Sequence, residues 1–249
     1  MTTPQGQKLY EGKAKILYTT AQPDVLLTYY KDDATAFNAQ KKGSIAHKGE
    51  VNCAVASHIF QYLAQRGIPT HFIAQTAPDQ MEVIAVQIVP IEVVVRNIAA
   101  GSICKRLGLP QGQILAQPLI EFFYKDDALG DPLITEDHIA LLNLASPDQV
   151  QELRRLALAI NIALKEFFDQ CRLTLVDFKI EIGIDPQGRL ILSDEISPDT
   201  CRLWDQDNPD PQGKILDKDR FRQDLGNVAE AYQTVLARVL AVVKPDQAS

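Results

Sequence analysis

The residues whose types and spacing most plainly suggest chemistry lie between positions 173 and 184. An extended strand over this segment places side chains alternately on two faces, because the side-chain period of a strand is two. One face would be apolar, with Val176, Phe178, Ile180 and Ile182. The other would carry Asp177, Lys179 and Glu181. This pattern predicts a strand that offers charged groups to a site on one side.

The run Asp185-Pro186-Gln187-Gly188 is typical of a turn and predicts a hairpin. A symmetric hairpin pairs Glu181 with Leu192 and Lys179 with Asp194, so that the charges gather on one face. Several carboxylates around one lysine repel each other unless a cation joins them. A divalent ion such as Mg²⁺ that carries nucleotide phosphates would relieve the repulsion. The alternative is a solvent-facing strand with surface ion pairs.

Cationic residues occur in two further segments. Glu11-Gly12-Lys13-Ala14-Lys15 places two lysines on one strand face beside a glycine, without the spacing of a Walker A loop. Arg96 ends a very apolar strand, and Gly101-Ser102 would open a short helix whose serine cap could bind an anion. A solvated strand and an ordinary strand-to-helix connection are the alternatives for these segments.

The run from Ser197 to Asp205 directly follows the expected second strand of the hairpin. Loops that leave such strands are well placed to bind substrates. Arg202 could bind a phosphate or carboxylate at two points through its planar guanidinium. The alternative is a surface turn fixed by Trp204, the only tryptophan.

The elements that must position these residues can be predicted from periodicity and turn signals. Strands are expected over 9–18, 25–30, 70–74, 81–89, 91–98, 173–184 and 190–196, with Pro90 at a strand end. Helices are expected over 51–66, 146–171 and 225–243. The second of these begins with a capping box, Ser146-Pro147-Asp148-Gln149. Residues 205–213 are expected to form a surface loop.

Composition limits the protein class. The chain has 249 residues, a net charge of −7 and 46% hydrophobic residues, which is typical of a globular protein with a substantial core. The acidic balance argues against nucleic-acid binding. No signal peptide or membrane span is expected. The four cysteines show no metal or disulfide spacing, the histidines show no paired spacing, and a cytoplasmic location is therefore predicted.

Several of these segments together resemble the SAICAR synthetase family (phosphoribosylaminoimidazole-succinocarboxamide synthases). The matching runs are 9–15, 91–102, 175–181, 193–205 and 218–223, in order and over nearly the whole chain. The resemblance implies a purine-biosynthesis ligase that joins L-aspartate to the carboxylate of carboxyaminoimidazole ribonucleotide while ATP becomes ADP and phosphate. It also implies an α+β fold similar to protein kinases and ATP-grasp enzymes, with a β-rich nucleotide-binding part, 1–90, and a mixed part, 91–249, that clasp ATP between them.

The resemblance further implies roles for individual residues. Nucleotide contacts would be Lys13, Ala14, Lys15, Lys125, Lys179, Glu181 and Asp194, of which Glu181 and Asp194 would hold Mg²⁺. Contacts to the ribonucleotide would be Arg96, Ser102, Asp177, Asp199 and Arg202. Lys179 and Asp177 are expected to be catalytic. The role of Asn38 and the residues that hold free aspartate stay open.

Two other functions remain possible at this point. A small-molecule kinase of similar fold would phosphorylate one acceptor and stop. A nucleotide-binding module without catalysis could dispense with the metal carboxylates, yet Glu181 and Asp194 are both present. The expected partners are small molecules, with neither nucleic acid nor membrane, and a homodimer is expected by analogy.

Overall fold

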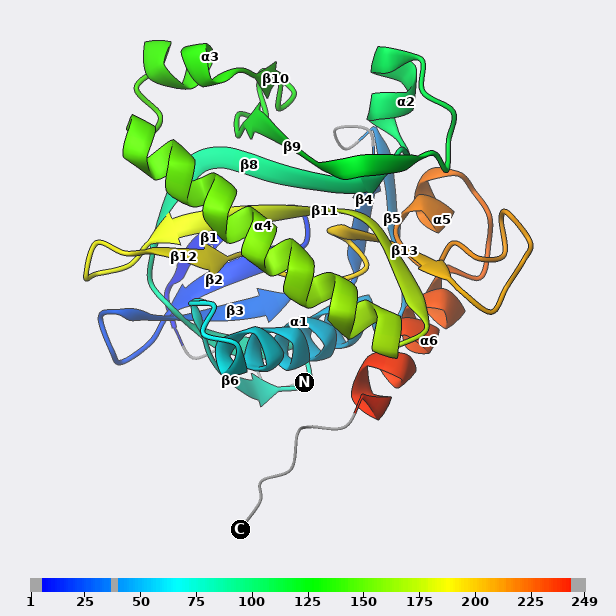
Figure 1. Ribbon diagram of the computed structural model, residues 1–249. Coiled ribbons are helices and arrows are strands. Elements are labelled where there is room, and N and C mark those ends of the chain that lie inside the picture. The colour runs from blue at the N-terminus through cyan, green and yellow to red at the C-terminus, as the bar shows by residue number, and fades with distance from the viewer. Residues whose placement is uncertain (1–5, 37–39, 243–249) are drawn as a thin grey trace.

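The computed structural model describes residues 6–36 and 40–242, which form two antiparallel sheets covered by helices (Figure 1). The first sheet has the strand order β1-β2-β3-β7-β6. Its strands are β1 (Lys8–Glu11), β2 (Lys15–Thr19), β3 (Val25–Tyr30), β7 (Gln80–Ile84) and β6 (Phe72–Ala77). A separate ribbon joins β4 (Asp33–Ala36) to β5 (Lys41–Ser44). Asn38 lies outside the described residues.

The second sheet has the order β10-β9-β8-β11-β12, with β13 paired to β11 as well. Its strands are β10 (Leu133–Ile134), β9 (Ile114–Tyr124), β8 (Gln87–Ile98), β11 (Leu173–Ile184), β12 (Leu190–Ser193) and β13 (Cys201–Asp205). The central strand β11 carries Asp177, Lys179 and Glu181. It is nearly continuous in buried residues, as expected for a strand covered on both faces.

Helices pack against these sheets and enclose the core. They are α1 (Lys48–Gln65), α2 (Ser102–Leu107), α3 (Glu136–Leu141), α4 (Pro147–Gln170), α5 (Asp219–Arg222) and α6 (Val228–Ala241). The long helix α4 crosses the second sheet, and α1 lies beside it (Figure 1). No helix among the described residues is both long and apolar enough to cross a membrane.

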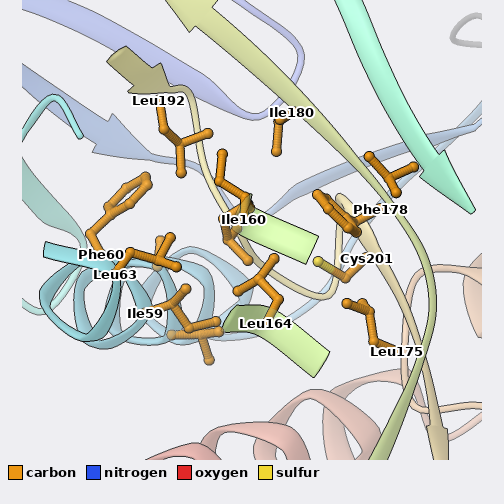
Figure 2. Packing of buried hydrophobic residues seen from close by; sticks show 14 of the residues in the cluster. Ile59, Phe60, Leu63, Ile160, Leu164, Leu175, Phe178, Ile180, Leu192 and Cys201 are labelled. Atoms are coloured by element: carbon orange, nitrogen blue, oxygen red, sulfur yellow. The ribbon is translucent and has the colours of Figure 1, made fainter. Parts of the chain in front are cut away.

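The core lies where α1 and α4 meet β11, and it holds the strand in place under the charged face. Phe60 of α1, Ile160 of α4 and Phe178 of β11 converge there (Figure 2). Each is fully or almost fully buried, and burying a side chain of this size contributes about 1.5–3 kcal/mol.

Main-chain hydrogen bonds join the two sheets along one seam. The amide of His71 donates to the carbonyl of Leu192 at 2.9 Å, and the amide of Leu192 donates to the carbonyl of Pro69 at 2.9 Å. On the other side, the amide of Ile84 at the end of β7 donates to the carbonyl of His71 at 2.7 Å. The segment before β6 therefore bridges β7 of the first sheet and β12 of the second.

The structure confirms the α+β class and several predicted elements. Strand β11 has the predicted bounds, and α4 begins with the predicted capping box, in which Ser146 accepts from the Gln149 amide. All four cysteines are unpaired. The division into parts 1–90 and 91–249 stays a prediction. The change of sheet occurs between β7 and β8, at residues 85–86.

Four predicted boundaries were wrong for local reasons. Strand β8 continues through Pro90. Its pairing with β11 shifts there, so the ladder does not need the main-chain N–H that proline lacks. Ser102 does not cap α2, because Gly101 holds the cap position with φ 66°. The strand expected over 9–18 is broken at Gly12, and the strand after the hairpin ends at Ser193. The long strand β9 was not predicted.

The hairpin register was also predicted one residue out. Glu181 pairs with Ser193, and Ile182 pairs with Leu192. The cause is a three-residue loop closed by Asp185 and Arg189, in which Gly188 takes a positive φ of 78°. The predicted pairing of Lys179 with Asp194 therefore does not occur in the ladder.

One side chain of β11 lies on the other side from its prediction. Val176 packs with Trp204 and Ile215 in a small second cluster, and does not join Phe178 in the main core. An irregularity in the pairing with β13, between Leu175 and Asp177, interrupts the alternation there.

Candidate active site

A cleft of about 980 Å³ contains most of the side chains that the sequence singled out. Its lining comes from β1, β2, β3 and β7 of the first sheet and from β8, β11 and β13 of the second. It is completed by β4, by α5 with the residue before it, and by the loops after β1, β7, β9, β12 and α1. Twelve predicted site residues were named, and all but Ser102 line it: Lys13, Ala14, Lys15, Arg96, Lys125, Asp177, Lys179, Glu181, Asp194, Asp199 and Arg202. Residues up to 189 positions apart in the chain, Lys13 and Arg202, therefore share one cavity.

One end of the cleft is apolar. The first sheet contributes Leu17, Leu26 and Val83, and β8 contributes Ile88, which pairs with Gly183 beyond the charged residues of β11. Such a lining suits a flat, uncharged ring system, since it offers dispersion contacts and few charges.

Lysines and carboxylates alternate in the middle of the cleft. Nζ of Lys179 lies 2.8 Å from Glu92 Oε1, 3.2 Å from Glu181 Oε1 and 4.0 Å from Asp194 Oδ2. Nζ of Lys125, just after β9, lies 2.8 Å from Glu181 Oε1. Burial opposes the charge of Lys179, but the surrounding carboxylates, Glu181 first, outweigh it and raise its pKa well above the usual range.

Lys15 crosses from the first sheet to the second. Its Nζ bonds Asp194 and lies 3.5 Å from Glu195 Oε1. Burial alone would raise the pKa of Asp194, yet Lys15 and Lys179 overcome it and hold that pKa well below 3.8. Asp194 is therefore ionised in the folded protein, with two ammonium groups as its neighbours.

The backbone at Asp194 explains how its side chain reaches this cluster despite the shifted register. Asp194 follows the last residue of β12 and has a φ of 63°, in the left-handed region. This conformation costs a non-glycine residue about 1–2 kcal/mol. It turns the chain out of the ladder, and the carboxylate comes within 4.0 Å of Lys179.

The carboxylates of the cleft suit a divalent ion that arrives with ligands of its own. Among residues 6–36 and 40–242, no three His, Cys, Asp or Glu side chains are arranged to hold a metal by themselves. Glu181 and Asp194 nevertheless share Lys179 as a neighbour, at 3.2 and 4.0 Å, so their carboxylates are close together. Mg²⁺ commonly binds through one or two carboxylates and completes its shell with phosphate oxygens and water. The donor set fits that mode of binding.

Two arginines share one aspartate at the next part of the cleft. Nη1 of Arg96 and Nη1 of Arg202 both donate to Asp177 Oδ2 at 2.8 Å. Arg96 also donates to Glu121 at 2.6 Å, and Arg202 donates through Nε to Asp219 at 2.7 Å. These carboxylates fix both guanidinium planes, so the remaining N–H groups are oriented before any anion arrives.

Gly101 provides the space for Arg202. A Cβ at position 101 would lie 2.4 Å from Nη2 of Arg202, and the φ of 66° is one that side chains rarely adopt. Ser102, the next residue, accepts from Nη2 of Arg96 at 3.3 Å and does not line the cleft itself. Gly101 therefore leaves room for the guanidinium of Arg202, and Ser102 holds that of Arg96 from outside the cleft.

Asp199 lies in a buried cluster that the sequence did not predict. It accepts from Lys48 at 2.9 Å, from Tyr232 at 2.6 Å and from Lys218 at 3.5 Å. Burial would raise the pKa of Asp199, but Lys218 and Lys48 outweigh it and lower that pKa below its usual range. Both of its oxygens are thus engaged by the protein itself.

Sequence reasoning missed Glu92, Glu195, Lys48, Lys218 and Arg222. Glu92 had a signal, since it is the one acidic residue within the apolar run 91–98. Lys48 had none, because a lysine at the start of a helix is ordinarily solvated, whereas this one is 1% exposed. Lys13, by contrast, was predicted. Its ammonium pairs with Asp127 at 2.7 Å near the mouth of the cleft, where both side chains are exposed.

Comparison with known proteins finds relatives that match over nearly the whole chain. The sequence model of the SAICAR synthetase family matches residues 8–239. The phosphoribosylaminoimidazole-succinocarboxamide synthase of Picosynechococcus sp. is 62% identical over 98% of this chain and 98% of its own. The solved structure of the synthase from Ehrlichia chaffeensis has 42% identity and a TM-score of 0.90, and covers 96% of this chain and 100% of that one. A SAICAR synthetase solved in complex with ADP has 42% identity and a TM-score of 0.88, over 95% of this chain and 99% of its own.

Proposed function

Because the chain belongs to the SAICAR synthetase family, and so joins L-aspartate to the carboxylate of 5-amino-1-(5-phosphoribosyl)imidazole-4-carboxylate with ATP in purine biosynthesis, we propose a place in the cleft for each reactant. All three reactants are anionic. A protein of net charge −7 must therefore hold them with cations concentrated in one place.

The nucleotide takes the apolar end and the lysine cluster. Its base lies among Leu17, Leu26 and Val83, and its phosphates lie against Lys13, Ala14 and Lys15 and against Lys125 and Lys179. The proposal is supported by the order of these groups along the cleft, apolar first and cationic next. A nucleotide has the same order from base to phosphates.

Glu181 and Asp194 hold Mg²⁺ when the nucleotide is bound. Bound there, the ion supplies positive charge to the phosphate oxygens and lowers the cost of charge build-up. The lysines that now neutralise the two carboxylates are then free to contact phosphate oxygens. Lys15 and Lys179 both lie beside Asp194 and can make this exchange.

The ribonucleotide takes the arginine end. Arg96 and Arg202 bind its phosphate and carboxylate oxygens, and Asp177 holds both guanidinium groups. Asp199 completes the surroundings, and Ser102 acts from outside the cleft by accepting from Arg96. Support comes from the shared carboxylate, which orients two planar donors before binding and so lowers the entropic cost of gripping an oxyanion.

L-Aspartate then binds to the cationic side chains that the other two reactants leave unused. Eight cationic side chains of residues 6–36 and 40–242 line the cleft, and after the assignments above Lys218 and Arg222 remain among them. Lys218 is weakly paired: within the described residues its ammonium forms one ion pair, with Asp199 at 3.5 Å, and Lys48 already binds that carboxylate. Burial and the nearby cations Arg222 and Lys48 lower the pKa of Lys218, against a partial opposing effect of Asp199. A substrate carboxylate beside it would supply the missing counter-charge.

The reaction follows from this order. An oxygen of the ribonucleotide carboxylate attacks the γ-phosphorus, and ADP leaves with the bond electrons. The aspartate amine attacks the activated carbonyl carbon, phosphate leaves, and the nitrogen loses a proton to form the amide. Lys179 lies between the two ends and offsets charge on the transferred phosphoryl group, while Asp177 keeps the acceptor's arginines in position.

The observation that carries this proposal is the convergence of Lys15, Lys179, Glu181 and Asp194 between an apolar end and an arginine end. The test is ADP release with each reactant omitted in turn. We expect sustained release only when ATP, the ribonucleotide and L-aspartate are all present. Rapid release without L-aspartate, with a stable phosphorylated ribonucleotide left behind, would instead make the protein a small-molecule kinase.

The setting of the enzyme is part of the proposal. A cytoplasmic location is supported by four unpaired cysteines, which suit a reducing compartment. A homodimer is proposed by analogy with the many small enzymes that pair through a two-fold axis. Sedimentation of the purified chain checks the dimer, and a single species at 27.6 kDa would rule it out.

A further inference from the structure

A buried carboxylate beside the arginine end has no place in the scheme above. Asp217 is fully buried, comes just before Lys218 and α5, and does not line the cleft. A buried carboxylate is costly unless it is hydrogen-bonded, so its hydrogen bonds indicate what it does.

Two main-chain amides share this carboxylate. Its Oδ2 accepts from the amide of Leu203 at 2.8 Å, and its Oδ1 accepts from the amide of Asp219 at 2.8 Å. Leu203 directly follows Arg202 in β13, and Asp219 accepts from Nε of Arg202 at 2.7 Å. Asp217 therefore joins the strand that carries Arg202 to the carboxylate that fixes the guanidinium of Arg202.

Main-chain hydrogen bonds attach the same segment to β13. The amide of Leu216 donates to the carbonyl of Leu203 at 3.0 Å. The carbonyl of Asp217 accepts from the amide of Arg220 at 3.0 Å, which begins the turn of α5. The side chain of Asp217 thus has a fixed base from which to hold Asp219.

Asp219 needs this support because two arginines of the cleft wall share it. It accepts from Nε of Arg202 at 2.7 Å and from Nη1 of Arg222 at 2.6 Å. Its helix, α5, has only four residues, and a single turn is barely stable by itself. A carboxylate on such a turn orients two guanidinium groups only if its own main chain is held.

The ionised form of Asp217 does not serve stability. Burial first, and then the neighbouring charge of Asp219, raise the pKa of Asp217 to about 7. Above that pH, folding by itself would therefore favour a neutral group at this position. A neutral amide, however, has one acceptor oxygen, whereas a carboxylate accepts from both main-chain donors.

We propose that Asp217 is a positioning residue for binding of the ribonucleotide: it ties the main chain of β13 to Asp219 and so holds the guanidinium of Arg202 where it can bind an oxyanion. This inference rests on the role proposed for Arg202. Asp217 acts through Arg202 and does not touch the reactants.

The experiment uses two substitutions at this position. Asp217→Asn keeps the shape but leaves one of the two amides without an acceptor, and Asp217→Ala removes both acceptors. For each variant we measure kcat, the KM of each substrate and the melting temperature. Calorimetric titrations with the ribonucleotide and with ADP are made at about pH 8, above the pKa of Asp217.

We expect Asp217→Asn to raise the Kd and the KM of the ribonucleotide about tenfold or more, because a displacement of about 1 Å in a positioning group can cost about 100-fold. Asp217→Ala should bind the ribonucleotide no better. The Kd of ADP should change less than about twofold, since Lys15 and Lys179 are held by other carboxylates.

Asp185→Asn is the matched control. Asp185 is also a buried aspartate that accepts from two main-chain amides, those of Gln187 at 3.0 Å and Arg189 at 2.8 Å, but these close the turn after β11. Its loss should lower the melting temperature and leave the Kd of the ribonucleotide within about twofold. If both Asp217 variants change only the melting temperature, or neither folds, Asp217 is a structural residue and the proposal fails.

Arg202→Met shows whether Asp217 acts through Arg202. Asp219 keeps Arg222 as a partner in this variant, so its carboxylate is not left unpaired. Adding Asp217→Asn to Arg202→Met should weaken binding of the ribonucleotide by less than about a further twofold. Fully additive losses would show that Asp217 acts by another route and would overturn the proposal.

The same variants separate this inference from the proposed function. If Arg202→Met binds the ribonucleotide as tightly as the wild type, the role of Arg202 fails and the positioning role fails with it. If Arg202→Met loses binding and Asp217→Asn behaves as the wild type, only the role of Asp217 is overturned.

Discussion

Asp194→Asn is the substitution that most directly tests the lysine and carboxylate cluster. The change removes one negative charge and keeps nearly the same volume. From the sequence alone, loss of a carboxylate from a repelling group would leave the stability unchanged or slightly raised. The structure reverses this expectation, because Asp194 has Lys15 and Lys179 as neighbours and its pKa lies below the usual range.

The size of the stability loss follows from the partners that remain. Two charges 4 Å apart near a protein surface interact by about 4 kcal/mol, before the cost of desolvation. After the substitution Lys15 keeps Glu195 at 3.5 Å, and Lys179 keeps Glu92 at 2.8 Å and Glu181 at 3.2 Å. Neither ammonium is left unpaired, so we expect the free energy of unfolding to fall by about 1–3 kcal/mol, less than for an isolated buried pair. For a chain of this size that lowers the melting temperature by roughly 2–4 °C per kcal/mol.

The pH dependence of the stability tests independently whether the charge of Asp194 stabilises the folded protein. Because the pKa of Asp194 is lower in the folded protein than the ordinary 3.8, its stabilising effect is present above pH 4 and is lost as the pH falls further. The difference in melting temperature between wild type and Asp194→Asn should therefore shrink below about pH 4. The exposed pair of Asp127 with Lys13 supplies the control, since Asp127→Asn should change stability by only about 0–1 kcal/mol.

Turnover provides the second measurement on the same variant. We expect kcat to fall about 10²–10³-fold, the usual cost of removing one preorganised electrostatic group from an active site. Added Mg²⁺ should restore only part of this, because an amide oxygen is a neutral and weaker ligand. Near-normal turnover with an unchanged Mg²⁺ requirement would refute the metal role, and a melting temperature equal to or above that of the wild type would refute the electrostatic reasoning.

Three further substitutions test the other parts of the cleft. Arg202→Lys should weaken binding of the ribonucleotide at least tenfold more than that of ATP, because one ammonium cannot contact Asp177, Asp219 and an oxyanion together; equal weakening in calorimetric titrations of both ligands would contradict this. Gly101→Ala should lower kcat/KM for the ribonucleotide about tenfold or more by displacing Arg202, and an unchanged value would show that the guanidinium has room to move. Lys218→Met should raise the KM for L-aspartate by about tenfold or more with little effect on the other two substrates, since a hydrogen bond to a charged group contributes about 1.5–3 kcal/mol; a rise for the ribonucleotide instead would assign Lys218 to its phosphate.

Local signals were enough to predict much of the fold. The capping box at Ser146 placed the start of α4, and the alternation of β11 gave its bounds and its charged face. Each depends on interactions within a few residues, which a single sequence displays. Strand β9 was missed because Pro118 interrupts it and its polar residues Gln117 and Glu121 do not alternate with apolar ones. Its position is set by pairing with β8 and β10.

The site was predictable only where its residues stand out from their neighbours. Lys179 and Asp194 were brought together by a register that proved wrong by one residue, and the left-handed backbone at Asp194 restored the contact by a different route. Asp199 was found, but its partners Lys48 and Tyr232 were not, because they come from α1 and α6 and meet only in the folded chain. Long-range burial of this kind leaves no periodic signal.

The seam between the two sheets also sets how the enzyme can move. Main-chain hydrogen bonds close the cleft along this edge: Pro69 accepts from Leu192, and His71 donates to Leu192 and accepts from Ile84. Any closing motion on the reactants must pivot there, and a point moves in proportion to its distance from the pivot. Strand β1 lies three places from β7 in the sheet, roughly 14 Å at the usual spacing of strands, so the turn at Gly12 would travel furthest. Asp194 lies two residues beyond Leu192, which belongs to this seam, and so would scarcely move. It is therefore a fixed reference against which the arriving phosphates are aligned.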